Sequence, residues 1–490
     1  MYYILSAIFF PILAGVFLLL KKESKSRKSL IRLTEVMLFL SALLTAAAFL
    51  LAGNREMIWF YITKDLPIMF HIDEMGMIFA VMSVVLFLCA GFFSFKYMKH
   101  KEKEKRYYGY YLMVLGMLNA LCFAGNLITF YLFFEMLTLS SMPLVLHNRS
   151  REAVMAGLKY LFYSLCGAYM ALFGIYFLQK YSDSLTFTPG GTVSAESFAA
   201  HSGILLAVGL VMIIGFGVKA GMFPMHAWLP TAHPVAPAPA SAVLSAVIVK
   251  VGVLAILRVV YYIFGADLLR GTWVQTVWMV LTLITVFMGS LLAYREPVLK
   301  KRLAYSTVSQ LSYILFGLSV MTVDSVTGSV LHVLCHGLIK TVLFLCAGAI
   351  IYMTGKTRVE ELRGIGKEMP VLMWCYTIVS LGLVGIPPTG GFVSKWYLAE
   401  GSLASGIPGF SWIGPVILLV SALLTAGYLL PVTIQGFFPG EDFDYGKLQK
   451  KEPSLVMLAP IILLTVLSVL IGLFPTVPAE MLSAIIGGLV

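Results

Sequence analysis

The chain has 490 residues, of which 59% are hydrophobic and 12% charged, and its mean hydropathy is +0.91. Soluble domains carry about 25% charged residues, so this composition excludes an ordinary soluble enzyme and indicates a membrane protein. Apolar runs recur from end to end with no long polar block between them. We therefore expect one all-α membrane domain over residues 1–490.

Apolar runs long enough to cross a bilayer, about 20 residues each, recur about fourteen times. The first, residues 2–20, follows no basic residue and is too long for a signal-peptide core, so we expect a retained helix. An even number of spans places both termini on one side of the membrane. The expected spans lie near residues 2–20, 30–52, 75–97, 107–125, 127–147, 153–178, 203–223, 241–264, 273–294, 300–320, 326–353, 369–404, 412–437 and 455–475.

Basic residues orient these spans, because cytoplasmic loops are enriched in Lys and Arg. The odd-numbered connections hold most of the loop cations, as in KYMKHKEKEKR (96–106). The even-numbered connections hold only Arg55, Lys64, Lys180 and Arg270. The pattern predicts a multi-pass protein of the cell (inner) membrane with both termini outside. It also explains the net charge of +11 without nucleic acid.

Cofactor motifs are absent from the sequence. It has no CxxC pair, no GxGxxG turn and no Walker A loop. The six cysteines lie in apolar runs, where thiols serve as small packing residues; they are Cys89, Cys122, Cys166, Cys335, Cys346 and Cys375. We expect no cofactor, no metal and no catalytic centre on this chain, and assign any redox chemistry to partner chains.

Several cations nevertheless lie within the apolar runs. Arg32, Lys159 and Arg258 are near span ends, where long side chains reach the interface, and a structural role is favoured for them. Four lysines lie deep within spans: Lys219, Lys250, Lys340 and Lys395. Each mid-membrane charge costs at least about 2.5–3.5 kcal/mol, so four of them indicate a function.

Other titratable groups accompany these lysines. Glu135, in ITFYLFFEMLTLSSMP, is the one carboxylate in the middle of an expected span. In HVLCHGLIK, the residues His332, His336 and Lys340 are spaced i, i+4 and i+8, so they share one helix face over roughly 12 Å. Histidine both accepts and donates protons near neutral pH. The stripe predicts a proton relay rather than isolated core histidines.

Two expected spans carry helix breakers near mid-membrane depth. One runs GFGVKAGMFPMHAWLP and the other VSLGLVGIPPTGGFVSKWYL, with breaks at Pro224, Pro387, Pro388, Gly390 and Gly391. Interrupted spans at matching places indicate inverted repeats with ion sites near the midplane. The expected segments are N-terminal helices (1–106), a first repeat (107–264), a second repeat (273–437), and a last helix with a short tail (455–490). The two repeats match imperfectly. The span of the second repeat that corresponds to the Glu135 span has only neutral polar groups, such as Ser309 and Gln310.

Two further histidines, His226 and His233, lie in MHAWLPTAHPVAPAP, which we interpret as a proline-rich cytoplasmic loop. Proton uptake and loop packing are equally compatible with this position.

Four stretches together resemble the antiporter-like membrane subunits shared by respiratory complex I (NADH-quinone oxidoreductase), Mrp-type cation/proton antiporters and membrane-bound hydrogenases. They are KAGMFPMHAWLPTAHPVAPAPASAVLSAVIVKVGVLAILR (219–258), KKRLAYSTVSQLSYILFGLS (300–319), HVLCHGLIKTVLFLCAG (332–348) and GIPPTGGFVSKW (385–396). The resemblance implies that Glu135 pairs with Lys219. It also implies that the proton path continues from Lys250 through the His332–His336–Lys340 stripe and ends at Lys395.

The resemblance further implies homologous membrane subunits and membrane lipid as partners, and a peripheral redox arm. A stand-alone Mrp-type Na⁺/H⁺ antiporter without a redox partner is the alternative. A transporter of small organic solutes, a structural anchor and an autonomous enzyme explain the line of buried charges less well. The sequence does not distinguish H⁺ transport from Na⁺/H⁺ exchange.

Overall fold

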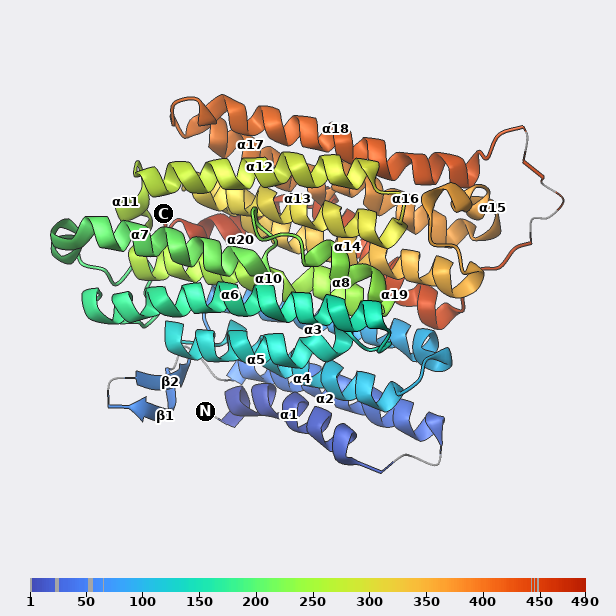
Figure 1. Ribbon diagram of the computed structural model, residues 1–490, viewed down its shortest axis with the longest axis horizontal. Coiled ribbons are helices and arrows are strands. Elements are labelled where there is room, and N and C mark those ends of the chain that lie inside the picture. Colours follow the sequence, from blue (N-terminus) through green and yellow to red (C-terminus); the bar gives the residue numbers. More distant parts are fainter. Residues whose placement is uncertain are drawn as a thin grey trace.

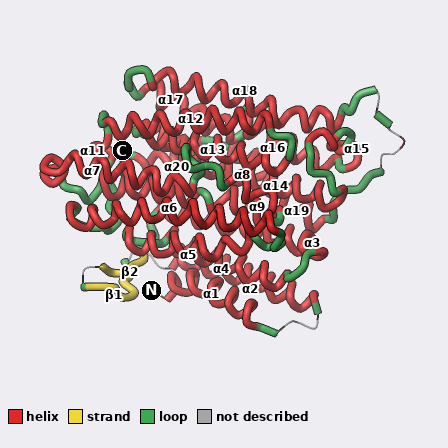
Figure 2. The backbone as a smooth tube through the Cα atoms, viewed as in Figure 1, coloured by secondary structure: helices red, strands yellow, loops and turns green. Residues whose placement is uncertain are grey.

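The computed structural model describes residues 2–22, 26–51, 56–64, 66–441, 443–444, 446 and 449–490. Within them the chain is mainly helical, and the helices run nearly parallel along the long axis of the molecule (Figures 1 and 2). Twelve described helices are long and apolar enough to cross a membrane. Three of the expected loop cations, Lys25, Arg55 and Lys447, lie outside the described residues.

The N-terminal part of the chain is arranged as follows: α1 (Tyr2–Leu20), α2 (Arg27–Leu51), β1 (Met57–Thr63), β2 (Leu66–Phe70), α3 (Glu74–Tyr97), α4 (Glu104–Cys122), α5 (Leu127–Val145), α6 (Arg151–Tyr181), α7 (Ala195–Lys219), α8 (Leu229–Val235) and α9 (Ala238–Val243). A π-helical turn (Leu244–Ile248), α10 (Lys250–Leu257) and a second π-helical segment (Arg258–Phe264) continue α9.

The remaining elements are α11 (Ala266–Leu269), α12 (Trp273–Arg295), α13 (Leu299–Val320), α14 (Val323–Thr354), α15 (Ile365–Glu368), α16 (Pro370–Val384), α17 (Gly390–Ala404), α18 (Phe410–Phe437), α19 (Leu455–Leu473) and α20 (Thr476–Ile486). The expected spans at 107–125 and 369–404 correspond to α4 and to the pair α16/α17. These helices are not among the twelve that are long and apolar enough to cross a membrane. The two inverted repeats stay a prediction.

Both termini lie at the same end of the molecule, the N-terminus beside the β1–β2 hairpin and the C-terminus near α11 and α20 (Figure 1). The opposite end, which we call the basic end, carries the α1–α2, α3–α4, α5–α6, α12–α13, α14–α16 and α18–α19 connections. The antiparallel hairpin was not expected from the sequence.

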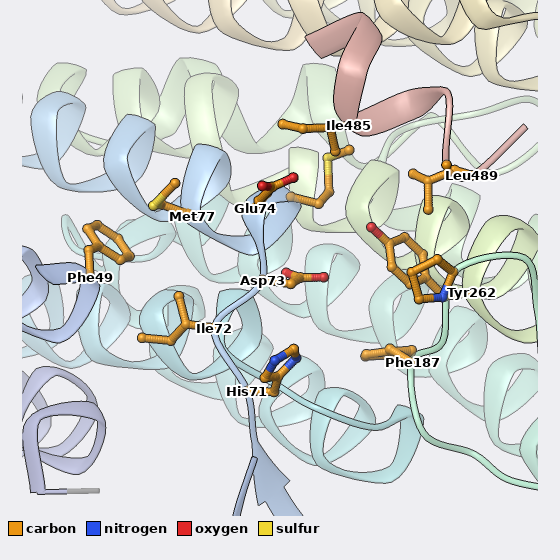
Figure 3. A pocket seen from close by; sticks show the side chains of 13 residues that line it. Phe49, His71, Ile72, Asp73, Glu74, Met77, Phe187, Tyr262, Ile485 and Leu489 are labelled. Carbon is orange, nitrogen blue, oxygen red and sulfur yellow. The ribbon is translucent and has the colours of Figure 1, made fainter. Parts of the chain in front are cut away.

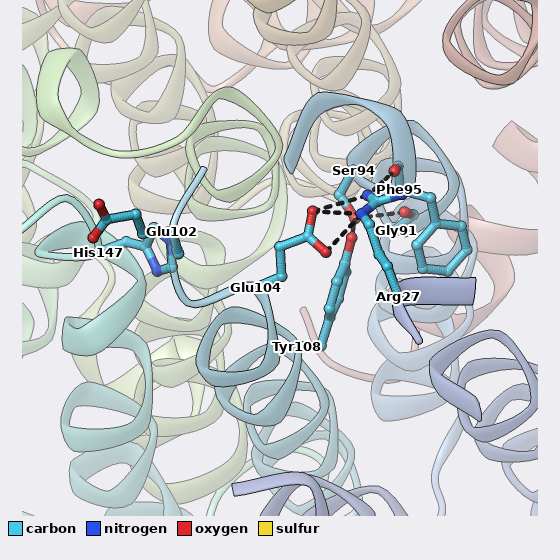
Figure 4. A network of polar contacts seen from close by, with 8 residues as sticks. All are labelled: Arg27, Gly91, Ser94, Phe95, Glu102, Glu104, Tyr108 and His147. Carbon is cyan, nitrogen blue, oxygen red and sulfur yellow. Dashed lines mark hydrogen bonds and ion pairs between the residues drawn. The ribbon is translucent and has the colours of Figure 1, made fainter. Parts of the chain in front are cut away.

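At the basic end, polar contacts join α2, α3 and α4 (Figure 4). Arg27, the first residue of α2, donates through Nε to both carboxylate oxygens of Glu104 at 2.9 Å, and through an Nη to the carbonyl of Phe95 at 2.6 Å. His147 contacts the carbonyl oxygen of Glu102 at 3.1 Å. These contacts fix the starts of α2 and α4 against the end of α3.

Side-chain caps explain where several helices begin. Asp73 accepts a hydrogen bond from the backbone N–H of Gly76 at 2.8 Å, and Asn126 accepts one from Thr129 at 2.8 Å. Ser194 caps α7, which therefore starts earlier than the expected residue 203.

The segment 238–264 lies at the centre of the molecule, between α13 and α14. Its most apolar stretch is completely buried. The helices at the periphery are much more exposed. In α2, for example, only 28% of the residues in the most apolar stretch are buried. The central helices are the ones that carry most of the predicted relay residues.

Candidate proton-transfer line

Lys219 is the last residue of α7, at the point where the helix is interrupted before α8 begins. Its side chain is 1% exposed. The ammonium donates to the hydroxyls of Thr138 on α5 at 2.8 Å and of Tyr160 on α6 at 2.6 Å, and lies 4.6 Å from the Tyr160 ring centroid. The Tyr160 hydroxyl in turn contacts Ser141 at 2.8 Å. The break at Pro224 thus leaves a lysine in a cage of hydroxyls.

Glu135 is one turn before Thr138 on α5 and is only partly buried. It interacts with Tyr131 on its own helix and acts electrostatically on Lys219. No ion pair joins Glu135 to Lys219 in the described structure, so the direct contact that the family resemblance implies is not formed. The ammonium instead donates two of its three N–H groups to the hydroxyls of Thr138 and Tyr160.

Lys250 begins α10, directly after the π-helical turn 244–248. The side chain is fully buried, and its ammonium donates to the carbonyl of Ala246 at 2.6 Å. It lies against Gly337 of α14, because a Cβ built on that glycine would be 3.0 Å from the Lys250 nitrogen. The missing side chain at Gly337 brings Lys250 beside the histidine stripe.

The stripe on α14 is confirmed as one buried row: His332, His336 and Lys340 all have 0% exposure. The rings of His332 and His336 lie 5.9 Å apart between centroids. His332 contacts Ser394 through Nδ1 at 2.9 Å and the Gln310 side-chain oxygen through Nε2 at 3.0 Å. Both ring nitrogens of His336 lack a hydrogen-bond partner among the described residues.

Lys340 extends the row toward the basic end. Its ammonium donates to the carbonyl of Leu303 at 3.1 Å and to the hydroxyl of Ser306 at 2.7 Å, both on α13. Tyr428 on α18 donates to the same Ser306 oxygen at 2.7 Å. Three helices, α13, α14 and α18, therefore meet at this end of the row.

Lys395 lies on α17, after the second break. Its ammonium donates to the carbonyls of Leu383 at 2.6 Å and Val384 at 3.1 Å, which are the last two residues of α16. Terminal carbonyls of a helix have no intrahelical partner, so the break created by Pro387 and Pro388 supplies acceptors for this cation. Ser394, the residue before Lys395, contacts His332.

The predicted residues therefore form two groups. One is the Lys219 cage with Glu135 nearby, and the other runs from Lys250 along α14 to Lys395. Helices α7 and α10 pack together where Gly252 approaches the Lys219 side chain. No side-chain hydrogen bond connects Lys219 to Lys250 within the described ranges.

Sequence reasoning missed most of the neutral partners of these groups, namely Thr138, Tyr160, Ser306, Ser394 and Tyr428. It named Gln310, but not as a partner of His332. Hydroxyl-bearing residues are common in membrane helices, so their identity alone carried no signal. Ser309, also named above, belongs to a different hydroxyl cluster, in which it donates to the carbonyl of Val286 at 2.9 Å.

Two sequence interpretations need correction. Arg258 does not reach an interface: it is 1% exposed and forms an ion pair with Asp73 at the start of α3. His233 is not in a loop but in helix α8, with 0% exposure. Only His226 lies in the interruption between α7 and α8. Arg32 is exposed, in agreement with a structural role.

A cavity of about 580 Å³ adjoins the Asp73–Arg258 pair at the end of the molecule that holds the termini. Figure 3 shows His71, Asp73, Glu74 and Tyr262 around it, together with Leu489 from the C-terminal segment. In the part of the chain that is described, no group of three or more His, Cys, Asp or Glu side chains is placed to hold a metal ion.

Comparison of the sequence with protein families shows which family this chain resembles. The profile of the NADH:quinone oxidoreductase/Mrp antiporter transmembrane family matches residues 124–438, which include the predicted line. The chain belongs to this family.

Relatives within the NADH:quinone oxidoreductase/Mrp antiporter family come from three kinds of complex. NADH-quinone oxidoreductase subunit N of Desulforudis audaxviator is 32% identical over 384 residues, covering 76% of this chain and 75% of the relative. A Na(+)/H(+) antiporter subunit of Bacillus subtilis is 30% identical over 402 residues, covering 82% and 79%. Hydrogenase-4 component B of Escherichia coli is 31% identical over 416 residues, covering 80% and 60%. The chain is thus an antiporter-like membrane subunit.

Solved structures show the same fold. A chain of the Mrp complex from Dietzia sp. superposes with a TM-score of 0.85 at 21% identity, covering 100% of this chain and 98% of that one. A chain of the membrane-bound sulfane sulfur reductase, an archaeal respiratory membrane complex, gives a TM-score of 0.86 at 23% identity, with 99% and 97% coverage.

Proposed function

We propose that this chain translocates protons as one subunit of a larger membrane complex. The proposed line consists of Glu135, Lys219, Lys250, His332, His336, Lys340 and Lys395.

The observation that carries this proposal is that four lysines deep within the helices, three of them buried and Lys395 partly buried, donate their hydrogen bonds to neutral oxygens. The acceptors are hydroxyls for Lys219, a carbonyl for Lys250, one of each for Lys340, and carbonyls for Lys395. None of the four forms an ion pair among the described residues. Static pairs would neutralise such costly charges, whereas an unpaired ammonium responds to any change of charge nearby. This favours transport over structural anchoring.

The mechanism begins at Lys219. When the Glu135 carboxylate approaches, it stabilises the protonated lysine. When it withdraws, only the hydroxyls of Thr138 and Tyr160 remain, and the proton moves toward Lys250. The contacts of Lys219 with the two hydroxyls are compatible with the withdrawn form of this proposal. The histidines of α14 and Lys340 then carry the proton laterally, and Lys395 exchanges it with the opposite aqueous phase.

Glu135 also suggests where the driving force acts. It lies on a face of α5 with Leu132, Met136 and Leu139, which are 36%, 39% and 56% exposed. A carboxylate beside lipid is costly, so we propose that a neighbouring membrane subunit covers this face and sets the charge state of Glu135.

The proposed driving force is a redox module on partner subunits, with the basic end in the cytoplasm and both termini outside. The relative named as a Na⁺/H⁺ antiporter subunit keeps the stand-alone antiporter as the second candidate. Mass spectrometry of what co-purifies from native membranes distinguishes them. Iron–sulfur, flavin or hydrogenase subunits support redox-driven pumping, and only cofactor-free membrane subunits support the antiporter.

Glu135→Gln tests the switch. We expect assembly to persist and coupled proton transport to fall at least about tenfold, since a positioned proton-transfer group commonly contributes more than that. Glu400→Gln, an exposed carboxylate on α17, is the control and should transport normally. Transport at the original rate in Glu135→Gln would remove the role given to this residue.

A further inference from the structure

Gln310 is a fully buried polar side chain of α13 that the proposed line does not include. Its side-chain oxygen lies 3.0 Å from Nε2 of His332, and its side-chain nitrogen has no hydrogen-bond partner among the described residues. The contact with His332 is therefore the one side-chain hydrogen bond that Gln310 forms within the described ranges. Burying an amide is costly, so a single bond to a residue of the line indicates a role toward that residue.

The other ring nitrogen of His332, Nδ1, lies 2.9 Å from the hydroxyl of Ser394 on α17. That hydroxyl also lies 3.1 Å from the carbonyl oxygen of Gly391. A hydroxyl has one proton to donate and can also accept. Ser394 can thus donate to a bare Nδ1, or accept from a protonated Nδ1 while it donates to Gly391.

Gln310 does not have this freedom in its observed orientation. An amide oxygen accepts and cannot donate, so the Nε2 atom that it faces must carry a proton. In a neutral imidazole, the hydrogen bond made by one nitrogen determines where the single proton is held. The neutral ring of His332 accordingly has its proton on Nε2 and a lone pair on Nδ1.

The other groups around the ring do not compete for Nε2. Lys250 and Lys395 act on the ring electrostatically, but ammonium groups only donate. The rings of Tyr313 and His336 approach it with a centroid distance of 5.9 Å in each case. Gln310 is the one side chain within hydrogen-bond distance of Nε2 in the described part of the chain.

We propose that Gln310 is a positioning residue, which holds a proton on Nε2 of His332 and so confines proton transfer to Nδ1, the nitrogen that contacts α17. This inference rests on the proposed function, and names the residue that directs the step from α14 to Lys395.

The step conserves protons. A proton that reaches the neutral ring of His332 binds to Nδ1, and the Ser394 hydroxyl turns from Nδ1 to the Gly391 carbonyl. The cationic ring then donates from both nitrogens, and all three observed contacts are satisfied at once. When the Nδ1 proton leaves, through water, for the neutral amine of Lys395, the hydroxyl turns back and the ring again has its proton on Nε2. Only N–H and O–H bonds form and break.

The test is nitrogen NMR of the complex with isotope-labelled histidine, because protonated and bare ring nitrogens give well-separated signals. A His332→Gln sample identifies the signals of His332 among the eight histidines. In the wild-type complex, the neutral ring should have its proton on Nε2. Gln310→Met removes the acceptor and should move the proton to Nδ1, where Ser394 still accepts it. Gln310→Glu keeps an acceptor oxygen and should keep a proton on Nε2, whereas a purely steric role would affect both variants alike.

Proton flux in proteoliposomes is the second readout. Gln310→Met should lower flux about tenfold, which is what the loss of one buried hydrogen bond costs in an equilibrium constant. The control is Ser312→Ala on the same helix, which removes a buried hydroxyl that has no partner among the described residues. It should change neither the His332 signals nor the flux.

A neutral His332 with its proton on Nδ1 in the wild-type complex overturns the inference, and so does an unchanged proton position in Gln310→Met. The wild-type spectrum and Gln310→Glu decide the matter if Gln310→Met fails to assemble. Normal flux in Lys219→Met would instead overturn the proposed function. Flux that is lost in Lys219→Met, together with an unchanged His332 in Gln310→Met, removes only the present inference.

Discussion

The ion pair between Asp73 and Arg258 allows the energetics of a buried charge to be measured directly. Arg258 is 1% exposed and its guanidinium lies against the rings of Phe187 and Tyr262, with centroid distances of 4.9 and 4.5 Å. Burial opposes ionisation of Asp73, but the charge and hydrogen bonds of Arg258, with the N–H of Gly76, hold the pKa of this carboxyl below its usual range. The perturbation is Asp73→Asn.

Asparagine remains a good N-cap for α3, so the substitution removes the charge while it keeps the bond to the Gly76 N–H. Arg258 is then a buried cation without an anion. Breaking a buried pair costs about 3–5 kcal/mol. Because the Asp73 side chain is 20% exposed, water partly replaces it, and we expect the lower value, about 3 kcal/mol.

The assay is thermal or denaturant unfolding of the purified complex in detergent, for Asp73→Asn, Arg258→Met and the double variant. Replacing both partners removes the unpaired charge, so the double variant should lose less stability than the sum of the losses in the two single variants. We expect a coupling energy of about 2 kcal/mol, within the range seen for residues in contact. Costs that simply add in the double variant would refute the reasoning.

Three further predictions concern single residues. Tyr160→Phe removes one of two hydroxyls that hold Lys219, a charge-assisted bond worth about 1.5–3 kcal/mol, and should slow transport about tenfold. Gly391→Ala should reduce the amount of folded protein, because its Cβ would collide with a backbone carbonyl of α16. Burial and the nearby Arg106 lower the pKa of His147 to about 4, so stability should fall as pH decreases from about 6.5 to 4, and His147→Gln should abolish that loss.

Matched controls accompany them. Tyr163→Phe alters a tyrosine near Lys159 instead of Lys219 and should transport normally. Gly203→Ala, on α7, meets no atom within 4 Å and should not reduce folding. The His147 account fails if the acid-induced loss of thermal stability is the same with and without the imidazole side chain.

Hydrophobic run lengths predicted most helices closely, as for the span at 127–147, observed at Leu127–Val145. They did not predict the β1–β2 hairpin, since its aromatic strand is indistinguishable from a short apolar stretch. They also missed that α8 is helical, because Pro230 and Pro234 suggested a loop. Pro230 is the second residue of α8, where a missing N–H costs nothing.

The charged residues of the site were predictable because burying a charge is costly wherever it occurs. All four lysines predicted deep within spans lie on described helices, and three of them are 0% or 1% exposed. Their partners were not predictable, because hydroxyls and helix-end carbonyls reach the lysines only through tertiary packing. The resemblance suggested a direct Glu135–Lys219 contact, but residue identity does not specify which acceptor the ammonium selects.

The most direct test of proton translocation is flux through proteoliposomes that contain the complex with Lys250→Met, compared with Lys159→Met. Methionine resembles the lysine stem in shape but carries no titratable proton. Lys250 is fully buried beside the histidines, whereas Lys159 lies on the partly exposed α6 away from the line. The account predicts that Lys250→Met loses proton flux while Lys159→Met keeps it, at equal amounts of assembled protein. Equal flux in the two variants would contradict it.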